Sequence, residues 1–459
     1  MNLVSKPVSE AVRKSVIYQI FLRPFTPEGT LASAARMLPH LAETGVDIVY
    51  LCPTMLADDD PRPEFWSPRQ NASGLGNPCN PYRVKDYFQT DPEYGTNEDL
   101  RAFVDAAHRL GMKVLLDLVY FHCGPQAVFL QDHPGFVRHN PDGSVKHGMW
   151  HFPELNFENP ELREYLWENM VFWIRTCGVD GYRTDVEGAV PTDFWEEGRR
   201  RMEAVKPEVV MLAESENPKA VAAAHDLSYA FAWSTCLKQV FLDGEPAGRI
   251  RACWEEMHAR MPQGTRFIRC TEHHDIALAL GEGRWNRIPP PERTEAAMAL
   301  NFTLDGVPFL YNGDEIGDGA LHSIYGNRFH GKTYLIDWSK AMTPAGQTRL
   351  AFTRELIRLR HASAALTRGD VRWLTTDRPD TVAAFARATA DERIFTVVNA
   401  TAEPCRARVE TGEAGAVTPD TCIARRAQWR LAADGDWQAD LGPFGFAVIR
   451  LPVAACPAG

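Results

Sequence analysis

The chain has 459 residues, of which 45% are hydrophobic and 24% are charged, and its formal net charge is -11 at pH 7. This composition is typical of a globular protein with a full core, and the length suits one large domain with a smaller one. The negative charge disfavours a nucleic-acid backbone as partner, so we expect no nucleic acid and a neutral substrate.

The first residues, MNLVSKPVSEAVRKS, lack the apolar region of a signal peptide, and no later run approaches the roughly 20 apolar residues of a membrane helix. We therefore expect a cytoplasmic protein with no membrane partner. The ten cysteines form no C-x-x-C pair, and several lie in apolar runs, which predicts reduced, buried thiols and not ligands: Cys52, Cys177, Cys236 and Cys270.

Strands and helices alternate from the start of the chain. Residues 15–21 and 47–52 are short β-branched and aromatic runs, and residues 31–45 between them have helical spacing closed by a glycine. A second helix is predicted over residues 97–110, followed by a buried strand over residues 113–120. These βαβ units predict a parallel sheet.

The segment GYRTDVEGAV, residues 181–190, follows an apolar approach over residues 172–179 and predicts a short buried strand. Arg183 and Asp185 are two residues apart, so in a strand they share one face, where the guanidinium can hold the carboxylate ionised. Asp185 is then a candidate nucleophile. Taken alone, the pair is more typical of a strand-end ion pair that caps the next helix, and only its company elsewhere in the chain favours the catalytic interpretation.

Carboxylates recur where other apolar runs end. Glu214 follows residues 209–213, Asp275 lies shortly after residues 266–270, and residues 307–311 lead into Asn-Gly-Asp-Glu. With a weaker strand near residues 228–233, about eight strands alternate with helices, which predicts a (β/α)8 TIM barrel. The last barrel helix is predicted over residues 344–361.

Two segments depart from this alternation. The segment of residues 123–158 is rich in Pro, Gly, Asn and aromatic residues, which interrupt any helical or strand pattern. It is too long for an ordinary loop, so it predicts a small inserted lid. After residue 369 short alternating runs predict a C-terminal antiparallel β-sandwich. The expected domains are a barrel over residues 1–122 and 159–365, the lid, and a sandwich over residues 369–459.

Several motifs together resemble the α-amylase superfamily of retaining glycoside hydrolases, family thirteen, including its α-glucosidases. The match extends over roughly residues 15–361, and several ordered matches over one barrel are far more specific than any single one. Four segments match the signature regions in order and spacing: DLVYFH (117–122), GYRTD (181–185), the Glu of MLAES (Glu214) and EHHD (272–275).

The resemblance implies catalytic roles for three carboxylates, with Asp185 the nucleophile, Glu214 the general acid/base and Asp275 the stabiliser of the distorted sugar. These are the groups that cleavage with retention requires. The resemblance also implies four substrate-binding residues and one supporting carboxylate: Tyr82, His122, Arg183 and His274, with Asp117 holding Arg183.

The sequence departs from calcium-dependent relatives at three points. Phe121 stands where they have an asparagine ligand, Glu154 replaces a lid aspartate, and Gly188-Ala189 replace a Lys-His pair that grips sugars beyond the cut. Calcium needs six to eight oxygens, so we expect no metal and no cofactor. The loss of Lys-His favours short oligosaccharides over extended starch, and Val186 leaves α-1,4 and α-1,6 linkages open.

We therefore expect a retaining glycoside hydrolase that cleaves α-glucosidic linkages of short α-glucans or oligosaccharides through a covalent glycosyl-enzyme intermediate. A transglucosidase or a trehalose-synthase-like isomerase uses the same intermediate and remains the main alternative. A non-catalytic carbohydrate-binding or transporter-associated homologue is disfavoured, because all three carboxylates are present. The sequence leaves the oligomeric state undetermined.

Overall fold

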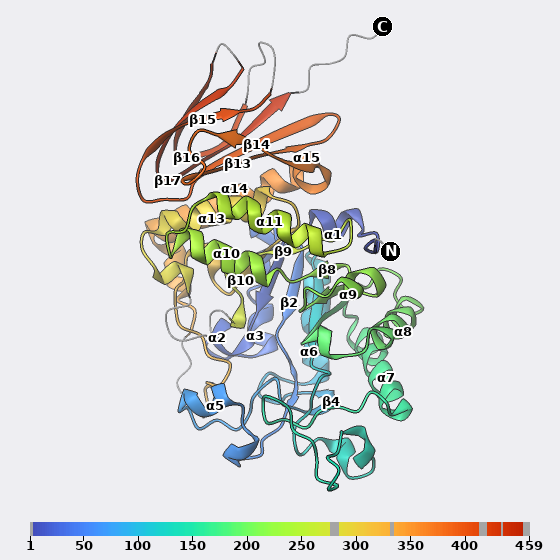
Figure 1. Ribbon diagram of the computed structural model, residues 1–459. Coiled ribbons are helices and arrows are strands. Elements are labelled where there is room, and N and C mark those ends of the chain that lie inside the picture. The colour runs from blue at the N-terminus through green and yellow to red at the C-terminus, as the bar shows by residue number, and fades with distance from the viewer. Residues whose placement is uncertain (1–2, 276–283, 331–334, 413–419, 433–434, 453–459) are drawn as a thin grey trace.

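The computed structural model describes residues 3–275, 284–330, 335–412, 420–432 and 435–452. Its centre is an eight-stranded parallel sheet in the order β8-β7-β6-β5-β2-β1-β10-β9 (Figure 1). An isolated parallel bridge between Ser228 and Phe267 joins the two ends of this order, so the sheet closes into the predicted barrel. The strands are β1 (Ile17–Ile20), β2 (Ile48–Leu51), β5 (Lys113–Leu118), β6 (Gly181–Thr184), β7 (Val210–Ala213), β8 (Leu227–Ser228), β9 (Ile268–Arg269) and β10 (Val307–Tyr311).

Helices surround this barrel because each has one apolar face to bury against the strands. In α6, for example, Thr96 and Asp99 form a capping box at the start, and Leu100, Phe103, Val104 and Ala107 are buried. The helices are α1 (Glu10–Lys14), α2 (Leu22–Phe25), α3 (Leu31–Ala35), α4 (Leu38–Thr44), α5 (Pro68–Ser73), α6 (Asn97–Arg109), α7 (Pro160–Cys177), α8 (Thr192–Glu203), α9 (Pro218–Ala223), α10 (Phe231–Phe241), α11 (Gly248–Arg260), α13 (Pro291–Thr303), α14 (Pro344–Ala362) and α15 (Ala364–Arg368).

Three predicted elements differ in the structure. The helix expected over residues 31–45 is two helices, α3 and α4, because Pro39 has no N–H to donate to the carbonyl of Ala35. Most of the apolar approach at residues 172–179 is the end of α7, and the strand begins only at Gly181. The strand expected at residues 228–233 is wrong beyond Ser228, because the apolar side chains that follow are spaced for a buried helical face in α10.

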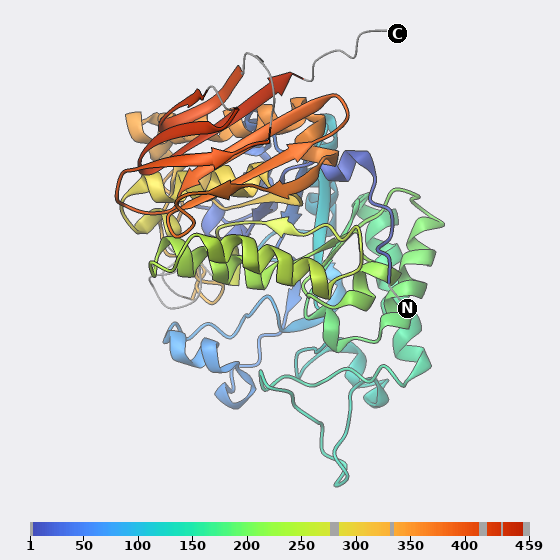
Figure 2. The same ribbon diagram turned by 45° about the horizontal axis from the view of Figure 1, so that its top comes forward.

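The segment predicted as a lid contains the short 3-10 turns η2 (Val128–Leu130) and η3 (Pro134–Phe136) and isolated antiparallel bridges. Phe129 and Phe136 are buried in the same core cluster as the barrel helices, which anchors the base of the segment. Figure 2 shows it projecting from the end of the barrel opposite the C-terminal strands, next to a two-stranded sheet of β3 (Met55–Ala57) and β4 (Val84–Thr90).

The C-terminal strands form an antiparallel sheet that folds over on itself about the long strand β17. The second part of β17 pairs with β14 and its first part pairs with β15, while β16 runs beside both parts. The rings of Phe395 and Trp437 meet between the two layers at 4.8 Å, so the predicted β-sandwich is confirmed. The strands are β11 (Asp370–Trp373), β12 (Thr375–Thr376), β13 (Val382–Ala388), β14 (Glu392–Asn399), β15 (Cys405–Glu410), β16 (Asp420–Leu431) and β17 (Trp437–Pro452).

The outer face of this sandwich packs on the barrel, where Phe446 of β17 meets Phe352 of α14 at 5.7 Å between ring centroids. This contact joins the two units through one continuous apolar core. Within the described residues, no helix is both long enough and apolar enough to cross a membrane.

Candidate active site

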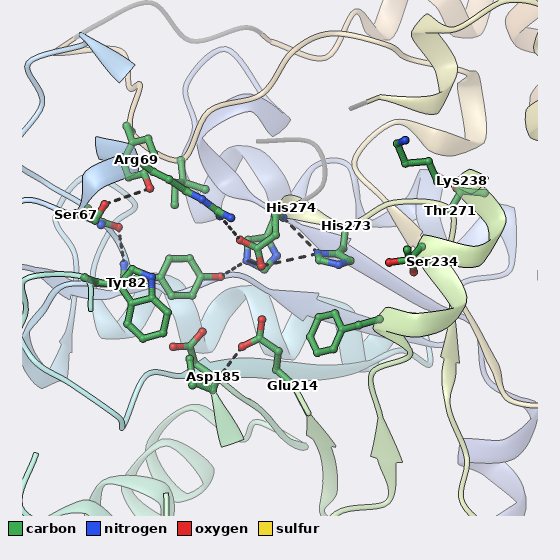
Figure 3. A pocket seen from close by; sticks show the side chains of 18 of the residues that line it. Ser67, Arg69, Tyr82, Asp185, Glu214, Ser234, Lys238, Thr271, His273 and His274 are labelled. Atoms are coloured by element: carbon green, nitrogen blue, oxygen red, sulfur yellow. Dashed lines mark hydrogen bonds and ion pairs between the residues drawn. The ribbon is translucent and has the colours of Figure 1, made fainter. Parts of the chain in front are cut away.

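A cavity of about 930 Å³ opens at the carboxyl ends of the barrel strands, where enzymes of this architecture place their chemistry (Figure 3). Six of the residues singled out in the sequence line it: Tyr82, His122, Asp185, Glu214, His274 and Asp275. Arg183 and Asp117 are buried beneath them. The structure therefore brings all eight predicted site residues together.

Arg183 joins three of the carboxylates. One of its terminal nitrogens, Nη1, lies 2.7 Å from Oδ1 of Asp117 and 2.7 Å from Oδ1 of Asp185. The other, Nη2, lies 2.7 Å from Oε1 of Glu214. One buried cation thus holds the two carboxyl groups that retaining chemistry requires in a fixed relation to each other.

The backbone at β6 explains this placement. Asp117 and Arg183 are register partners in the parallel strands β5 and β6, so their side chains emerge side by side. At Gly181 a Cβ would stand 1.9 Å from the carbonyl oxygen of Val210, so only glycine allows β6 to approach β7 here. Asp185 follows directly after β6 and stays on the face of Arg183, as the sequence predicted.

A chain of hydrogen bonds supports the carboxylates from the side of β1, β2 and β5. The hydroxyls of Tyr50 and Tyr82 donate to Oδ2 of Asp117 at 2.5 and 3.1 Å. The Tyr82 hydroxyl also lies 2.7 Å from Nε2 of His274, and Nδ1 of His274 lies 2.7 Å from the amide nitrogen of Gln19. With Tyr82 donating to Asp117, His274 is a neutral imidazole that donates from Nε2 and accepts at Nδ1.

The two central carboxyl groups are hard to ionise together. Burial raises the pKa of Asp185 to about 7, although Arg183 opposes the rise. Burial raises the pKa of Glu214 well above its ordinary value, and the charges of Asp185 and Asp275 raise it further against the pull of Arg183. The arrangement therefore favours a state in which the two carboxyl groups share one proton and Glu214 carries it. A general acid needs this protonated state.

The histidines and the third carboxylate differ from this pair. Burial lowers the pKa of His122 to about 4 and that of His274 to about 3, so both are neutral hydrogen-bonding groups at neutral pH. Burial opposes ionisation of Asp275, but the positive charge of the His274 and His273 imidazoles, when they are protonated at low pH, and of the Arg183 guanidinium brings its pKa below the ordinary value. Asp275 thus supplies a fixed negative charge to the cavity.

Several residues around the cavity were not singled out by sequence reasoning. Tyr50 and Gln19 lie inside the predicted strands, and only their position near the ends of β1 and β2 would have indicated them. Arg69 reaches Asp275 at 3.3 Å from the short helix α5, in a segment that has no motif. Phe231 lies at the start of α10, in the segment that was wrongly predicted as strand.

One group of side chains beside the cavity could in principle bind a metal ion. Among the described residues, His273, His274 and Asp275 could offer three ligand atoms within 4.8 Å of one another. Both ring nitrogens of His274 are already engaged, by Tyr82 and Gln19, so this group fits a metal poorly. Where calcium-dependent relatives have an asparagine, the ring of Phe121 packs 5.9 Å from Trp150, and Glu154 pairs with Lys146 at 2.8 Å.

The chain matches a known protein family over most of its length. Residues 12–138 and 145–351 match the family model described as alpha amylase, catalytic domain. The chain belongs to the α-amylase family. This membership covers the barrel and confirms the expected α-glycosidase.

Curated relatives of this α-amylase family member are similar over most of their length. A cyclomaltodextrinase from a Bacillus species is 27% identical over 440 residues, covering 84% of this chain and 73% of the relative. Neopullulanase 2 of Thermoactinomyces vulgaris is 28% identical over 468 residues, covering 90% of this chain and 74% of the relative. Among solved structures, a noncanonic maltogenic alpha-amylase from Thermotoga neapolitana has a TM-score of 0.76 at 21% identity, covering 96% of this chain and 97% of that one, which shows the shared fold.

Proposed function

We propose that this α-amylase family member hydrolyses α-glucosidic bonds of short oligosaccharides, with Asp185 as nucleophile and Glu214 as general acid/base. The observation that carries the assignment is the contact of Arg183 with both carboxyl groups, each at 2.7 Å. The cation favours the ionised form of Asp185, and the excess of negative charge around it leaves the proton on Glu214.

The proposed reaction has two steps. In the first, a carboxylate oxygen of Asp185 bonds to the anomeric carbon while the glycosidic bond breaks and Glu214 gives its proton to the leaving oxygen. In the second, Glu214 as carboxylate takes a proton from water, whose oxygen bonds to the anomeric carbon and releases Asp185. Two inversions give a product with the starting α configuration.

The surrounding residues bind the glucose unit on which this reaction occurs. Asp275 places negative charge where the oxocarbenium-like transition state is positive. In this proposal His122 and His274 are neutral groups that hydrogen-bond to sugar hydroxyls, with Nε2 of His274 exchanging its bond to Tyr82 for one to the sugar. Tyr82 offers an aromatic face for stacking. In this proposal Arg183 and Asp117 act by orienting the carboxylates.

The alternative of transfer or isomerisation differs only in the group that attacks the intermediate. The cavity of about 930 Å³ has room for a second sugar beside the reacting one. A transglucosidase or a trehalose-synthase-like isomerase is therefore the second candidate function. Hydrolysis is favoured because the relatives that match over most of the chain are named as a cyclomaltodextrinase and a neopullulanase.

We also propose that the catalytic domain is the barrel over residues 1–122 and 159–365, that residues 123–158 act as a lid, and that residues 369–459 form a C-terminal β-sandwich domain. A cytoplasmic location is part of the proposal. Free thiols at all nine described cysteines and a relative named intracellular maltogenic amylase, from Bacillus subtilis, support it.

The experiment is incubation with maltose, maltotriose, isomaltose, sucrose, trehalose and starch, followed by product chromatography and by proton NMR in the first minutes. We expect hydrolysis of at least one short substrate, with the α-anomer formed first. A β-anomer formed first would contradict the double displacement, and conversion of one disaccharide into another without free glucose would favour the isomerase.

A further inference from the structure

The cavity has two unlike ends with the carboxylates between them. Figure 3 shows Ser67, Arg69 and Tyr82 on one side of Asp185, and Glu214, Ser234 and Lys238 on the other side. The first end is formed by the loop around α5 and by residues 324–325, and the second end by α10. This asymmetry determines which part of a substrate each end can take.

The chemistry gives the cavity a direction. A general acid that protonates the leaving oxygen must lie on the side of the leaving group, whereas the sugar that forms the covalent bond stays with the nucleophile. Glu214 lies toward α10, so the leaving group extends along α10. The sugar units on the non-reducing side of the cleaved bond must then fit between Asp185 and the segment of Ser67 and Arg69 at the start of α5.

That first end is closed by buried contacts between two loops. The hydroxyls of Ser67 and Tyr325 meet at 3.4 Å, and the side-chain amide of Asn77 donates to the carbonyl of Tyr325 at 2.9 Å. Ser67, Ile324 and Tyr325 are all buried, so they form a wall with little free space behind it. Arg69 extends over the top of this wall to Asp275.

A buried ion pair makes the wall rigid. Arg23 pairs with Glu93 through Nε and Nη2, each at 2.9 Å, and it also donates to the backbone carbonyls of Cys79 and Ile324 in the two loops. Asn327 binds the same glutamate at 2.8 Å. Because these groups are buried and hydrogen-bonded to both loops, moving the wall would break several charged hydrogen bonds at once.

The second end has side chains that suit a sugar ring. Phe231 is 39% exposed and lines the cavity at the start of α10, beside Ser234 and a Lys238 that pairs with Asp243 at 2.8 Å. An exposed aromatic ring can stack on the apolar face of a sugar, and the hydroxyl, ammonium and carboxylate groups beside it can bind the sugar's hydroxyls.

We propose that the cavity accepts one glucose unit on the nucleophile side and that the enzyme therefore removes single glucosyl units from non-reducing ends, with the leaving sugar stacked on Phe231. This inference rests on the proposed function and specifies the substrate of the same site. It predicts that chains without a free non-reducing end, cyclic maltodextrins included, are not substrates.

The test compares end products on three substrates with the whole chain. From maltotriose labelled at its reducing end we expect labelled maltose and unlabelled glucose first, and we expect no cleavage of cyclic maltohexaose or of a maltoheptaose blocked by a 4,6-O-ethylidene group. Labelled glucose as the first product, or cleavage of either blocked substrate at a comparable rate, would overturn the inference while leaving the proposed function intact. Failure to cleave any glucoside would instead remove the proposed function and the inference with it.

The role of Phe231 has its own measurement. Phe231→Ala should raise KM for maltose roughly 5-fold through the lost stacking, and leave KM for α-glucosyl fluoride, which has no leaving sugar, unchanged. Phe329→Ala, at an exposed phenylalanine outside the cavity lining, is the matched control and should change neither value. An equal rise in KM for both substrates in Phe231→Ala would contradict the assignment of α10 to the leaving-group side.

Discussion

The backbone N–H of Val186 donates to Oε2 of Glu214 at 2.8 Å, and Val186 makes this bond from a left-handed conformation with φ of 44°. A β-branched residue is strained there, so the surrounding structure must hold it in place. Asp185 directly precedes Val186 in the chain, so this hydrogen bond fixes the carboxyl of Glu214 opposite that of Asp185.

Glycine and proline at position 186 should separate the conformation from the hydrogen bond. Val186→Gly keeps the N–H and tolerates the positive φ, so we expect a free energy of unfolding within about 1 kcal/mol of the parent and retained turnover. Val186→Pro removes the N–H and requires φ near -65°, so turnover should fall by at least tenfold. Urea unfolding and kcat measure both variants. Full activity in Val186→Pro would show that this hydrogen bond does not position Glu214.

Arg183 is the only cation placed between Asp117, Asp185 and Glu214 by the ion pairs of the described residues. Arg183→Met leaves these carboxyl groups buried without their partner and should lower the free energy of unfolding by about 3–5 kcal/mol at pH 7. Arg101→Met, at an exposed arginine on α6, is the control and should change it by less than about 0.5 kcal/mol.

The pH dependence of that deficit gives a further check. Without the cation, the folded-state pKa values of the carboxyls stand still further above their unfolded values, so the loss of stability is fully present above the folded pKa. It should shrink as pH falls toward the unfolded pKa of about 4. A deficit that stays constant between pH 8 and pH 4.5 would indicate lost packing in place of unpaired charge.

The pH profile of kcat/KM should follow the protonation of the two central carboxyls. Burial raises the pKa of Asp185 to about 7, so the nucleophile is lost to protonation as pH falls through 7. On the alkaline side, activity falls when Glu214, whose pKa burial raises well above its ordinary value, loses its proton. Initial rates with subsaturating substrate from pH 4.5 to 9 measure both limbs. An acidic limb centred near 4 would contradict the raised pKa of Asp185.

Metal removal should have no effect. Phe121 packs against Trp150 and Glu154 pairs with Lys146, so two positions that would offer oxygen ligands in calcium-dependent relatives are engaged otherwise. Treatment with EDTA followed by gel filtration should leave kcat and Tm unchanged. A fall in either value that added calcium reverses would show that a metal is bound elsewhere.

The sequence predicted the barrel from local patterns, and it predicted the eight site residues mainly through the family resemblance of the motifs around them. Each strand is a short apolar run, and Asp117, Asp185 and Glu214 lie at or just after the ends of such runs, which a parallel barrel brings to one edge. The C-terminal strands were predicted in a similar way, from short alternating runs of residues after position 369.

The errors and omissions have physical causes as well. Residues 229–241 are apolar enough for a strand, and only the spacing of Trp233, Leu237 and Val240 shows the helix. Arg69 reaches the cavity from the short helix α5 and Tyr325 reaches it from an irregular loop, and the positions of both segments depend on distant partners such as Arg23 and Glu93. No local pattern carries that information, so the closed wall could be recognised only in three dimensions.

The central claim, that Asp185 forms the covalent intermediate and Glu214 supplies the proton, is tested most directly by turnover of α-glucosyl fluoride. Asp185→Asn keeps the shape of the side chain and removes the attacking charge, whereas Glu214→Gln keeps the nucleophile, and fluoride leaves with little acid assistance. We expect Asp185→Asn to lose several orders of magnitude in kcat on every substrate, and Glu214→Gln to recover formation of the intermediate on the fluoride but not on maltose. Near-normal turnover of any substrate by folded Asp185→Asn would contradict the mechanism.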